Sequence, residues 1–188
     1  MDDRMLAATR RIFMAAIVAA SVAAPAAHAG PSRAALDQDG QAALQQLYAS
    51  TPKARELSGK SRAILVFPKI VKAGLMVGGL SGDGVLFENG RPVGYFNMSA
   101  GTYGMQAGIQ KYSYALFFVT SSALDYVRSS KGWSIGSGPS VVVMDKGKAK
   151  STNSTTLTQD VYAFPFGQKG LMAGLGLEGS KITEIHPS

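Results

Sequence analysis

The chain has 188 residues and a formal net charge of +7, a length that suffices to bury the core of one domain. It contains no cysteine and two histidines, His28 and His186. Disulfides, thiol catalysis, histidine-based triads and most zinc or copper sites are thereby excluded or nearly so. We expect neither a metal nor a cofactor, and no catalytic residue.

Residues 1–29 have the pattern of a removable export signal. Basic residues precede a small and apolar run at 12–24, and Ala27-His28-Ala29 has the small-x-small pattern of a cleavage site, with Gly30 as the new N-terminus. The pair Arg10-Arg11 fits either an ordinary Sec signal or a twin-arginine signal. We expect an exported, periplasmic protein, free or peripheral to a membrane. Without cysteine it cannot be a lipoprotein anchored through that residue.

Residues 30–188 form the expected single domain, and they are basic. Sixteen basic residues face ten acidic ones once the signal is removed. The basic segment, residues 53–72, holds one acid, Glu56, and six cations: Lys53, Arg55, Lys60, Arg62, Lys69 and Lys72. On an exported protein such a face favours an anionic lipid surface or polysaccharide over nucleic acid. The alternative is a solvated face that only aids solubility.

The first part of the domain, residues 32–58, is predicted to be helical. Apolar residues from Leu36 to Tyr48 recur at helical spacing, although Gly40 weakens the middle. Thr51-Pro52 indicates a second, short helix that Gly59 ends. The apolar stripe either packs on a sheet or lies on a membrane. Its acidic and amide-rich polar side favours packing.

From residue 61 to 186 the pattern is that of strands. Asn89-Gly90 marks a hairpin, and Ser122–Ser130 is predicted to be a helix with Ser122 at its start and Gly132 as its C-cap. The expected strands are 63–67, which Pro68 ends, 85–88, 93–98, 114–120, 140–144, 161–164, 171–177 and 182–185. Residues 151–158 are predicted to be a loop or an exposed edge strand.

Nineteen of the 22 glycines follow residue 73, which indicates bulges and sharp bends within the sheet. The fold class is therefore predicted to be α+β. N-terminal helices pack on a curved, glycine-rich, mostly antiparallel and barrel-like sheet, with one intervening helix.

Several short motifs, most of them containing glycine, lie between Ser61 and Ile185, about four-fifths of the mature chain: Ala63–Lys69, Lys72-Ala73-Gly74, Val77-Gly78-Gly79, Gly82–Leu86, Gly94-Tyr95-Phe96, Gly104–Gln110, Gly138-Pro139, Lys169–Gly174 and Leu177–Ser180. In order and spacing these motifs resemble the SYLF domain, a lipid-binding family. Family members often carry Trp near Tyr95-Phe96, so a contact that depends on Trp is in doubt there.

The resemblance implies non-enzymatic lipid binding. Eukaryotic relatives resemble phosphoinositide-binding modules that use an amphipathic N-terminal helix and basic residues, often beside an SH3 domain and actin. Phosphoinositides are not expected in a periplasm, so what carries over is attraction of phosphate headgroups by cations and burial of acyl chains by apolar surface. The protein partner, if any, is unknown.

Two local motifs suggest other activities. Gly132–Gly136 matches G-x-S-x-G with Ser134 as nucleophile, but an esterase needs a strand-to-helix elbow and a histidine base, and the motif follows a helix. Gly174–Gly179 matches G-x-G-x-x-G, but too few residues follow for the helix of a dinucleotide site. A turn explains each motif better.

We therefore expect periplasmic, non-enzymatic binding of anionic phospholipid by the six cations of the basic segment, with Arg62, Lys69 and Lys72 as the principal residues. Tyr95 and Phe96 are candidate apolar contacts, although at least one should lie in the core because neighbouring strand residues face opposite sides. The main alternative is a structural envelope module that binds protein or polysaccharide, and the remote one is a serine esterase.

Overall fold

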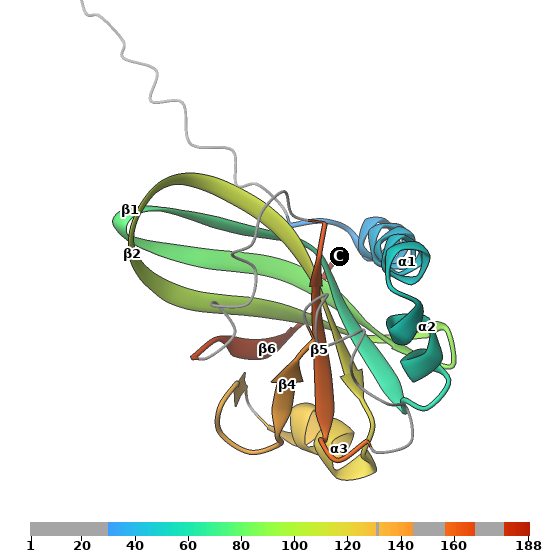
Figure 1. Ribbon diagram of the computed structural model, residues 1–188. Helices are drawn as coiled ribbons and strands as arrows, with labels where there is room; N and C mark the ends of the chain where they lie inside the picture. Colours follow the sequence, from blue (N-terminus) through green and yellow to red (C-terminus); the bar gives the residue numbers. More distant parts are fainter. Residues whose placement is uncertain (1–29, 131, 145–156, 168–178) are drawn as a thin grey trace, which may run out of the picture.

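The computed structural model describes residues 30–130, 132–144, 157–167 and 179–188, without the side chains at 75 and 103–107. This part of the chain forms three helices and six strands (Figure 1). In chain order they are α1 (Arg33–Ser50), α2 (Pro52–Ser58), β1 (Ala63–Glu88), β2 (Arg91–Phe118), α3 (Ser121–Ser129), β3 (Trp133–Ser134), β4 (Val141–Val143), β5 (Val161–Phe166) and β6 (Lys181–Ile185). The expected α+β class, with helices before a curled and mostly antiparallel sheet, is confirmed.

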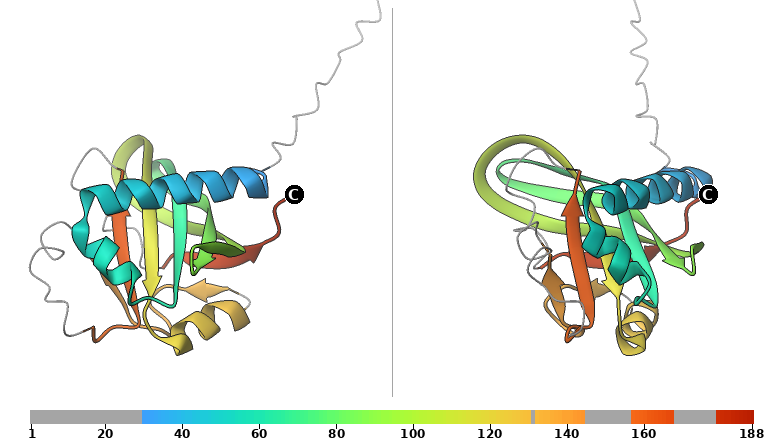
Figure 2. Two further views of the ribbon diagram at one scale, coloured as in Figure 1. Left: turned by 90° about the vertical axis from the view of Figure 1, so that its right-hand side faces the viewer. Right: turned by 45° about the vertical axis from the view of Figure 1, so that its right-hand side comes forward.

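The two N-terminal helices form where the apolar spacing and capping residues predict them. The side chain of Ser32 accepts a hydrogen bond from the backbone N–H of Ala35 and caps α1. Pro52 stands in the first turn of α2, where a missing N–H costs nothing, and Gly59 is its C-cap. Figure 2 shows α1 lying across the strands, so the apolar stripe packs on the sheet.

β1 and β2 are two very long strands joined at Asn89-Gly90, where both residues have positive φ as a two-residue hairpin turn requires. The whole hairpin then folds back on itself (Figure 1). The reversal in β1 lies at Met76, with φ of 63°, between residues 63–74 and 77–88, which form its two arms. β2 follows the same curve on the outside.

Glycines let the two arms of β1 approach each other. A Cβ on Gly84 would lie 2.6 Å from the carbonyl oxygen of Val66 and the same distance from a ring carbon of Phe67. A side chain there would collide with the backbone of the first arm, so only glycine fits. Glycine was predicted to let the sheet curve, and at Gly84 it does so by allowing the two arms of β1 to come into direct contact.

The remaining strands extend the sheet from the edge of β2 that β1 leaves free, at two separate segments of β2. The strand order is β3-β6-β2-β5-β4, and β1 pairs with β2 off this path. β6 pairs with Tyr95–Ser99 of β2, and β5 pairs with Ser113–Phe118. These pairs are antiparallel, whereas β4 and β5 are parallel.

Two apolar clusters occupy the two faces of this sheet. The inner core fills the curl, closed by Ala123, Leu124 and Val127 of α3. Its largest fully buried members are Leu65, Phe67, Ile70, Leu86, Met98, Tyr114, Leu116, Phe118 and Trp133. The outer core joins the sheet to the N-terminal helices through residues that include Leu47, Leu57, Val66, Phe117 and Phe164.

Some boundaries differ from the predictions. Pro68 does not end the first strand, because it lies in a register shift between Phe67 and Ile70 where no ladder N–H is needed; its carbonyl accepts a hydrogen bond of 2.7 Å from the hydroxyl of Ser113. The cap of α3 is Thr120 rather than Ser122, since its hydroxyl accepts from the N–H of Ala123.

The predicted C-cap of α3 is also wrong by two residues, since Ser130 rather than Gly132 follows the last helical residue, Ser129. The predicted strand at 171–177, the Gly174–Gly179 motif up to residue 178, and most of the predicted loop at 151–158 lie outside the described residues.

Candidate functional site

The six cations of the basic segment fall into two groups in the structure. Lys53, Arg55 and Lys60, here called the α2 cations, already have partners. The Nζ atoms of Lys53 and Lys60 lie 3.4 Å and 3.1 Å from the carboxylate oxygens of Glu56. The guanidinium of Arg55 lies 5.7 Å from the ring centroid of Tyr48.

The other three cations, Arg62, Lys69 and Lys72, are here called the free cations. They form no ion pair with any residue that the structure describes. Arg62 and Lys69 are exposed and Lys72 is half-buried. Their charges are therefore available to an external anion.

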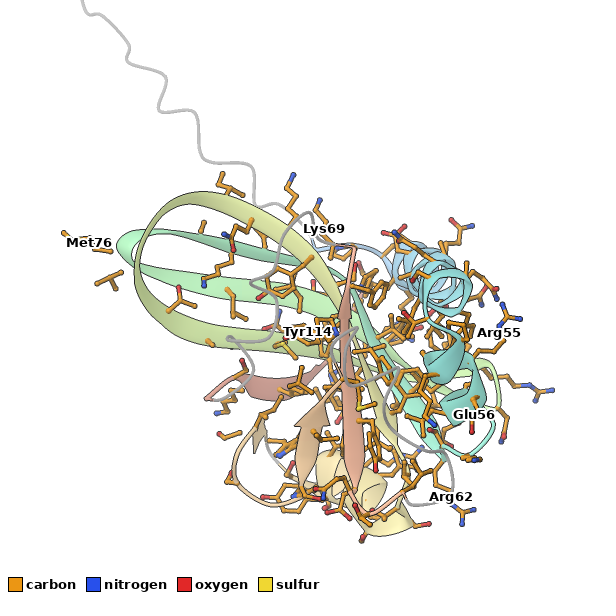
Figure 3. The ribbon with its side chains drawn as sticks, viewed as in Figure 1. Arg55, Glu56, Arg62, Lys69, Met76 and Tyr114 are labelled. Atoms are coloured by element: carbon orange, nitrogen blue, oxygen red, sulfur yellow. The ribbon has the colours of Figure 1, made fainter. Side chains whose placement is uncertain are left out.

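The basic segment does not form one patch. Figure 3 places Arg55, Glu56 and Arg62 on the side of the molecule that carries α2, whereas Lys69 lies further along β1 toward the bend of the hairpin. Lys72 continues β1 in that direction, and Lys111 of β2 pairs opposite Val71, so it joins the same region. The six cations are close in sequence, but the length of β1 separates them in space.

Tyr95 and Phe96 serve the fold. Phe96 is 3% exposed and belongs to the inner core, as expected for at least one of the pair. The hydroxyl of Tyr95 donates a 3.1 Å hydrogen bond to a carboxylate oxygen of Asp37, and the guanidinium of Arg33 lies 5.9 Å from its ring centroid. Burial, followed by the hydrogen bond to Asp37, raises the pKa of Tyr95. These contacts tie α1 to β2 and leave a lipid contact by either ring as an untested prediction.

The structure exposes apolar residues that the sequence analysis did not select. At the bend of the hairpin Met76, Val77 and Ile109 are 70%, 65% and 71% exposed; together they are here called the bend tip. Figure 3 shows Met76 at the extreme end of the hairpin. The glycines around residues 74–79 were a signal for a bend, but exposure depends on how far the hairpin projects from the body, which local spacing does not give.

The interior of the curl is filled by side chains. Tyr114, Phe118 and Trp133 are each at most 1% exposed, and the rings of Phe118 and Trp133 are 6.0 Å apart. Burial raises the pKa of the Tyr114 hydroxyl, followed by the effect of Tyr112. Since this part of the interior is packed, we place lipid contact on the surface.

The environment of Ser134 does not fit a hydrolase. Ser134 is an exposed residue of the two-residue strand β3, which follows α3 and pairs with Lys181 in β6. A nucleophile elbow has the opposite order, with a strand leading into a helix. The carbonyl of Ser134 accepts from the hydroxyl and the N–H of Ser137, which is the geometry of a turn.

Within the described ranges, no group of three or more His, Cys, Asp or Glu side chains is placed to hold a metal ion. The helices in these ranges are also too short or too polar for one of them to cross a bilayer.

Comparison with known proteins gives one family. The family model described as "Ysc84: Las17-binding protein actin regulator" matches residues 99–186, from within β2 to just beyond β6. This match confirms the SYLF resemblance, although residues 61–98 of that resemblance lie outside it. A search of curated proteins gives no match. The family is one of lipid-binding domains and not a known enzyme family, so it fits a non-enzymatic binding role.

Proposed function

We propose that this protein, whose residues 99–186 match the Ysc84 (SYLF) family model, binds anionic phospholipid in the periplasm without catalysing a reaction. The observation that carries the proposal is the set of free cations, Arg62, Lys69 and Lys72, which no described carboxylate neutralises. Cations close to an anionic membrane contribute about 1 kcal/mol each to binding. Such a contact is useful but reversible.

The expected export signal supports lipid over nucleic acid as the partner, because it directs the chain away from the cytoplasm. The positive charge supports an anionic over a zwitterionic surface, because the mature chain has sixteen basic and ten acidic residues. The family description refers to Las17 and actin regulation. For an exported chain we carry over lipid binding alone from this family.

Co-sedimentation of the exported protein with vesicles tests the function. We expect binding to phosphatidylglycerol or cardiolipin vesicles, weaker binding to phosphatidylcholine vesicles, and a loss of binding as salt is raised, because surface attraction is screened within about 10 Å at 0.1 M salt. Binding that is equal on both vesicle types, or absent from acidic vesicles at low salt while the protein stays folded, contradicts the proposal.

Two charge-matched triple variants locate the contact. Replacing Arg62, Lys69 and Lys72 with Gln removes the same formal charge as replacing Lys53, Arg55 and Lys60 with Gln. The first set should weaken vesicle binding more, because its charges are free, whereas the α2 cations already face Glu56 and Tyr48. Equal losses would show that net charge alone matters, and no loss in the first variant removes those residues from the site. Thermal unfolding of each variant controls for folding.

A further inference from the structure

We propose that the bend tip, Met76, Val77 and Ile109, is the part of the molecule that enters the lipid surface. This inference rests on the proposed function and adds to it the residues that penetrate and the orientation of the protein on the membrane. The evidence lies in the exposure of these side chains, the close approach of the two arms of β1 behind them and the charge of the stretches that build the bend.

The bend tip presents apolar side chains where folding would normally bury them. Each of the three is at least 65% exposed, whereas the other exposed large apolar side chains among the described residues, Val93 and Tyr126, are 48% and 39% exposed. Met76 and Val77 are adjacent in β1. Ile109 of β2 pairs with Ala73 of β1, which lies three residues before the reversal at Met76. The three thus gather at one projecting end of the hairpin, as Figure 3 shows for Met76.

The bend is held in shape by its own backbone. A Cβ on Gly74 would lie 2.5 Å from the Cα of Gly78, so the two arms of β1 nearly touch just behind Met76. β1 and β2 pair along both arms, from Ala63–Phe118 to Gly74–Gly108 and from Met76–Gly104 to Glu88–Arg91, with a register shift at the reversal between Gly74 and Met76. Because the paired arms already form the projection, its conformation need not be created on binding, which limits the entropy lost.

The two stretches of chain that build the bend carry positive charges and no acidic residue. The sequence contains no Asp or Glu from residue 57 to 82 or from 98 to 124, the two stretches that build the bend. Lys69 and Lys72 precede it on β1 and Lys111 follows it on β2, and none of the three forms an ion pair with a described residue. At about 3.3 Å per strand residue, Lys72 and Lys111 lie within about 15 Å of the tip.

This order of residues matches an anionic bilayer. An apolar group placed about 5–10 Å deep reaches the boundary between headgroups and acyl chains, while lysines a few residues behind it remain among the phosphates. A second copy of the chain fits less well. Two tips would bring like charges together, and three side chains offer far less than the roughly 800 Å² per partner of a stable protein interface.

Site-specific labelling tests penetration directly, because the chain has no cysteine of its own. Met76→Cys carries an environment-sensitive nitrobenzoxadiazole (NBD) label, and Gln46→Cys, at an exposed position of α1, carries the same label as control. With phosphatidylglycerol vesicles we expect the label at 76 to brighten, shift to the blue and be quenched by lipids brominated near the headgroup. The label at 46 should not respond.

A charge-neutral pair of variants measures the contribution to affinity. Val77→Ser with Ile109→Ser removes two apolar side chains of the bend tip, and Val93→Ser removes one exposed apolar side chain near the opposite end of the hairpin. The double variant should bind phosphatidylglycerol vesicles about tenfold more weakly or worse, with unchanged salt dependence, whereas Val93→Ser should bind like the parent.

The outcomes separate this inference from the proposed function. If the parent protein binds acidic vesicles while the label at 76 stays silent and the double variant binds normally, penetration by the tip is wrong and lipid binding stands. If the parent protein binds no acidic vesicle, the proposed function itself fails. If the double variant alters the oligomeric state in sedimentation analysis but not vesicle binding, a second copy is the occupant and the inference is overturned.

Discussion

At the scale of single residues, Asp160 shows how one carboxylate joins distant elements. Its oxygens accept hydrogen bonds from the backbone N–H of Ser140 at 2.9 Å, the hydroxyl of Ser140 at 2.8 Å and the hydroxyl of Thr120 at 3.0 Å. These bonds, with the backbone bond from Ser140 first, lower the pKa of Asp160. The residue links the start of α3 to the starts of β4 and β5.

Asp160 should therefore contribute a pH-dependent part of the stability. Its folded-state pKa lies below the ordinary value of 3.8, so its contribution is present above that pH and is lost as the pH falls through the folded-state pKa. We expect Asp160→Asn to lower the free energy of unfolding by about 1 kcal/mol at pH 7, and by less at pH 3, in urea denaturation at both pH values.

Asp125→Asn provides the control for this prediction, because the side chain of Asp125 is exposed on α3 and accepts no hydrogen bond from any residue that the structure describes. It should change the stability little at either pH. A deficit in Asp160→Asn that is as large at pH 3 as at pH 7 would show that the carboxylate charge has no role.

At the scale of elements, Gly40 explains how α1 fits the sheet. As a glycine in mid-helix it weakens the local propensity for helix, yet it is buried in α1. A Cβ at this position would overlap a methyl group of Val85 and lie 3.1 Å from the ring of Phe87. The helix gives up intrinsic stability so that it can lie close to β1.

Gly40→Ala is expected to destabilise the protein even though alanine favours helix by about 1 kcal/mol over glycine. The methyl group would meet the stiff side chain of Val85, and overpacking of this kind costs about 1–3 kcal/mol. Gln45→Ala, at an exposed position of the same helix, should be neutral or slightly stabilising. Thermal unfolding measures both, and a melting temperature for Gly40→Ala at or above that of the parent contradicts the proposed packing.

At the scale of the whole molecule, the curl divides the protein into a body and a projection. The body holds both apolar cores together with the N-terminal and intervening helices, and the folded-back hairpin extends from it (Figures 1 and 2). Arg33 at the start of α1 holds the last residues of the sequence: its backbone N–H donates a hydrogen bond to the carbonyl of Ser188, and its Nε donates one to the carbonyl of Pro187. In the part of the chain that the structure describes, the bend tip is thus an exposed apolar end carried by a packed body.

Export is the prediction that belongs to this scale. We expect the periplasmic form to begin at Gly30, as read by intact mass, and Ala29→Arg to leave an uncleaved precursor, because the peptidase accepts a small residue there. Replacing Arg10 and Arg11 with Lys separates the routes. Continued export indicates a Sec signal, and lost export a twin-arginine signal. A cytoplasmic full-length protein would contradict export itself.

The sequence alone determined what depends on neighbouring residues. Helical spacing and Pro52 predicted both N-terminal helices, Asn89-Gly90 predicted the turn because it needs two positive φ angles, and the glycine motifs predicted the family. The lack of cysteine and the scarcity of histidine set aside whole classes of chemistry. Each of these inferences uses covalent or nearest-neighbour properties that no later folding can change.

Only the tertiary structure decided which charges are free and which apolar side chains are exposed. Lys53 and Lys60 share Glu56, Lys69 lies apart from Arg62, and Phe96 lies in the core. Pro68 lies within a strand because a register shift accommodates it. These features arise because one long hairpin folds back on itself and brings residues that are distant in the chain into contact. Short-range sequence patterns do not specify where such a contact forms.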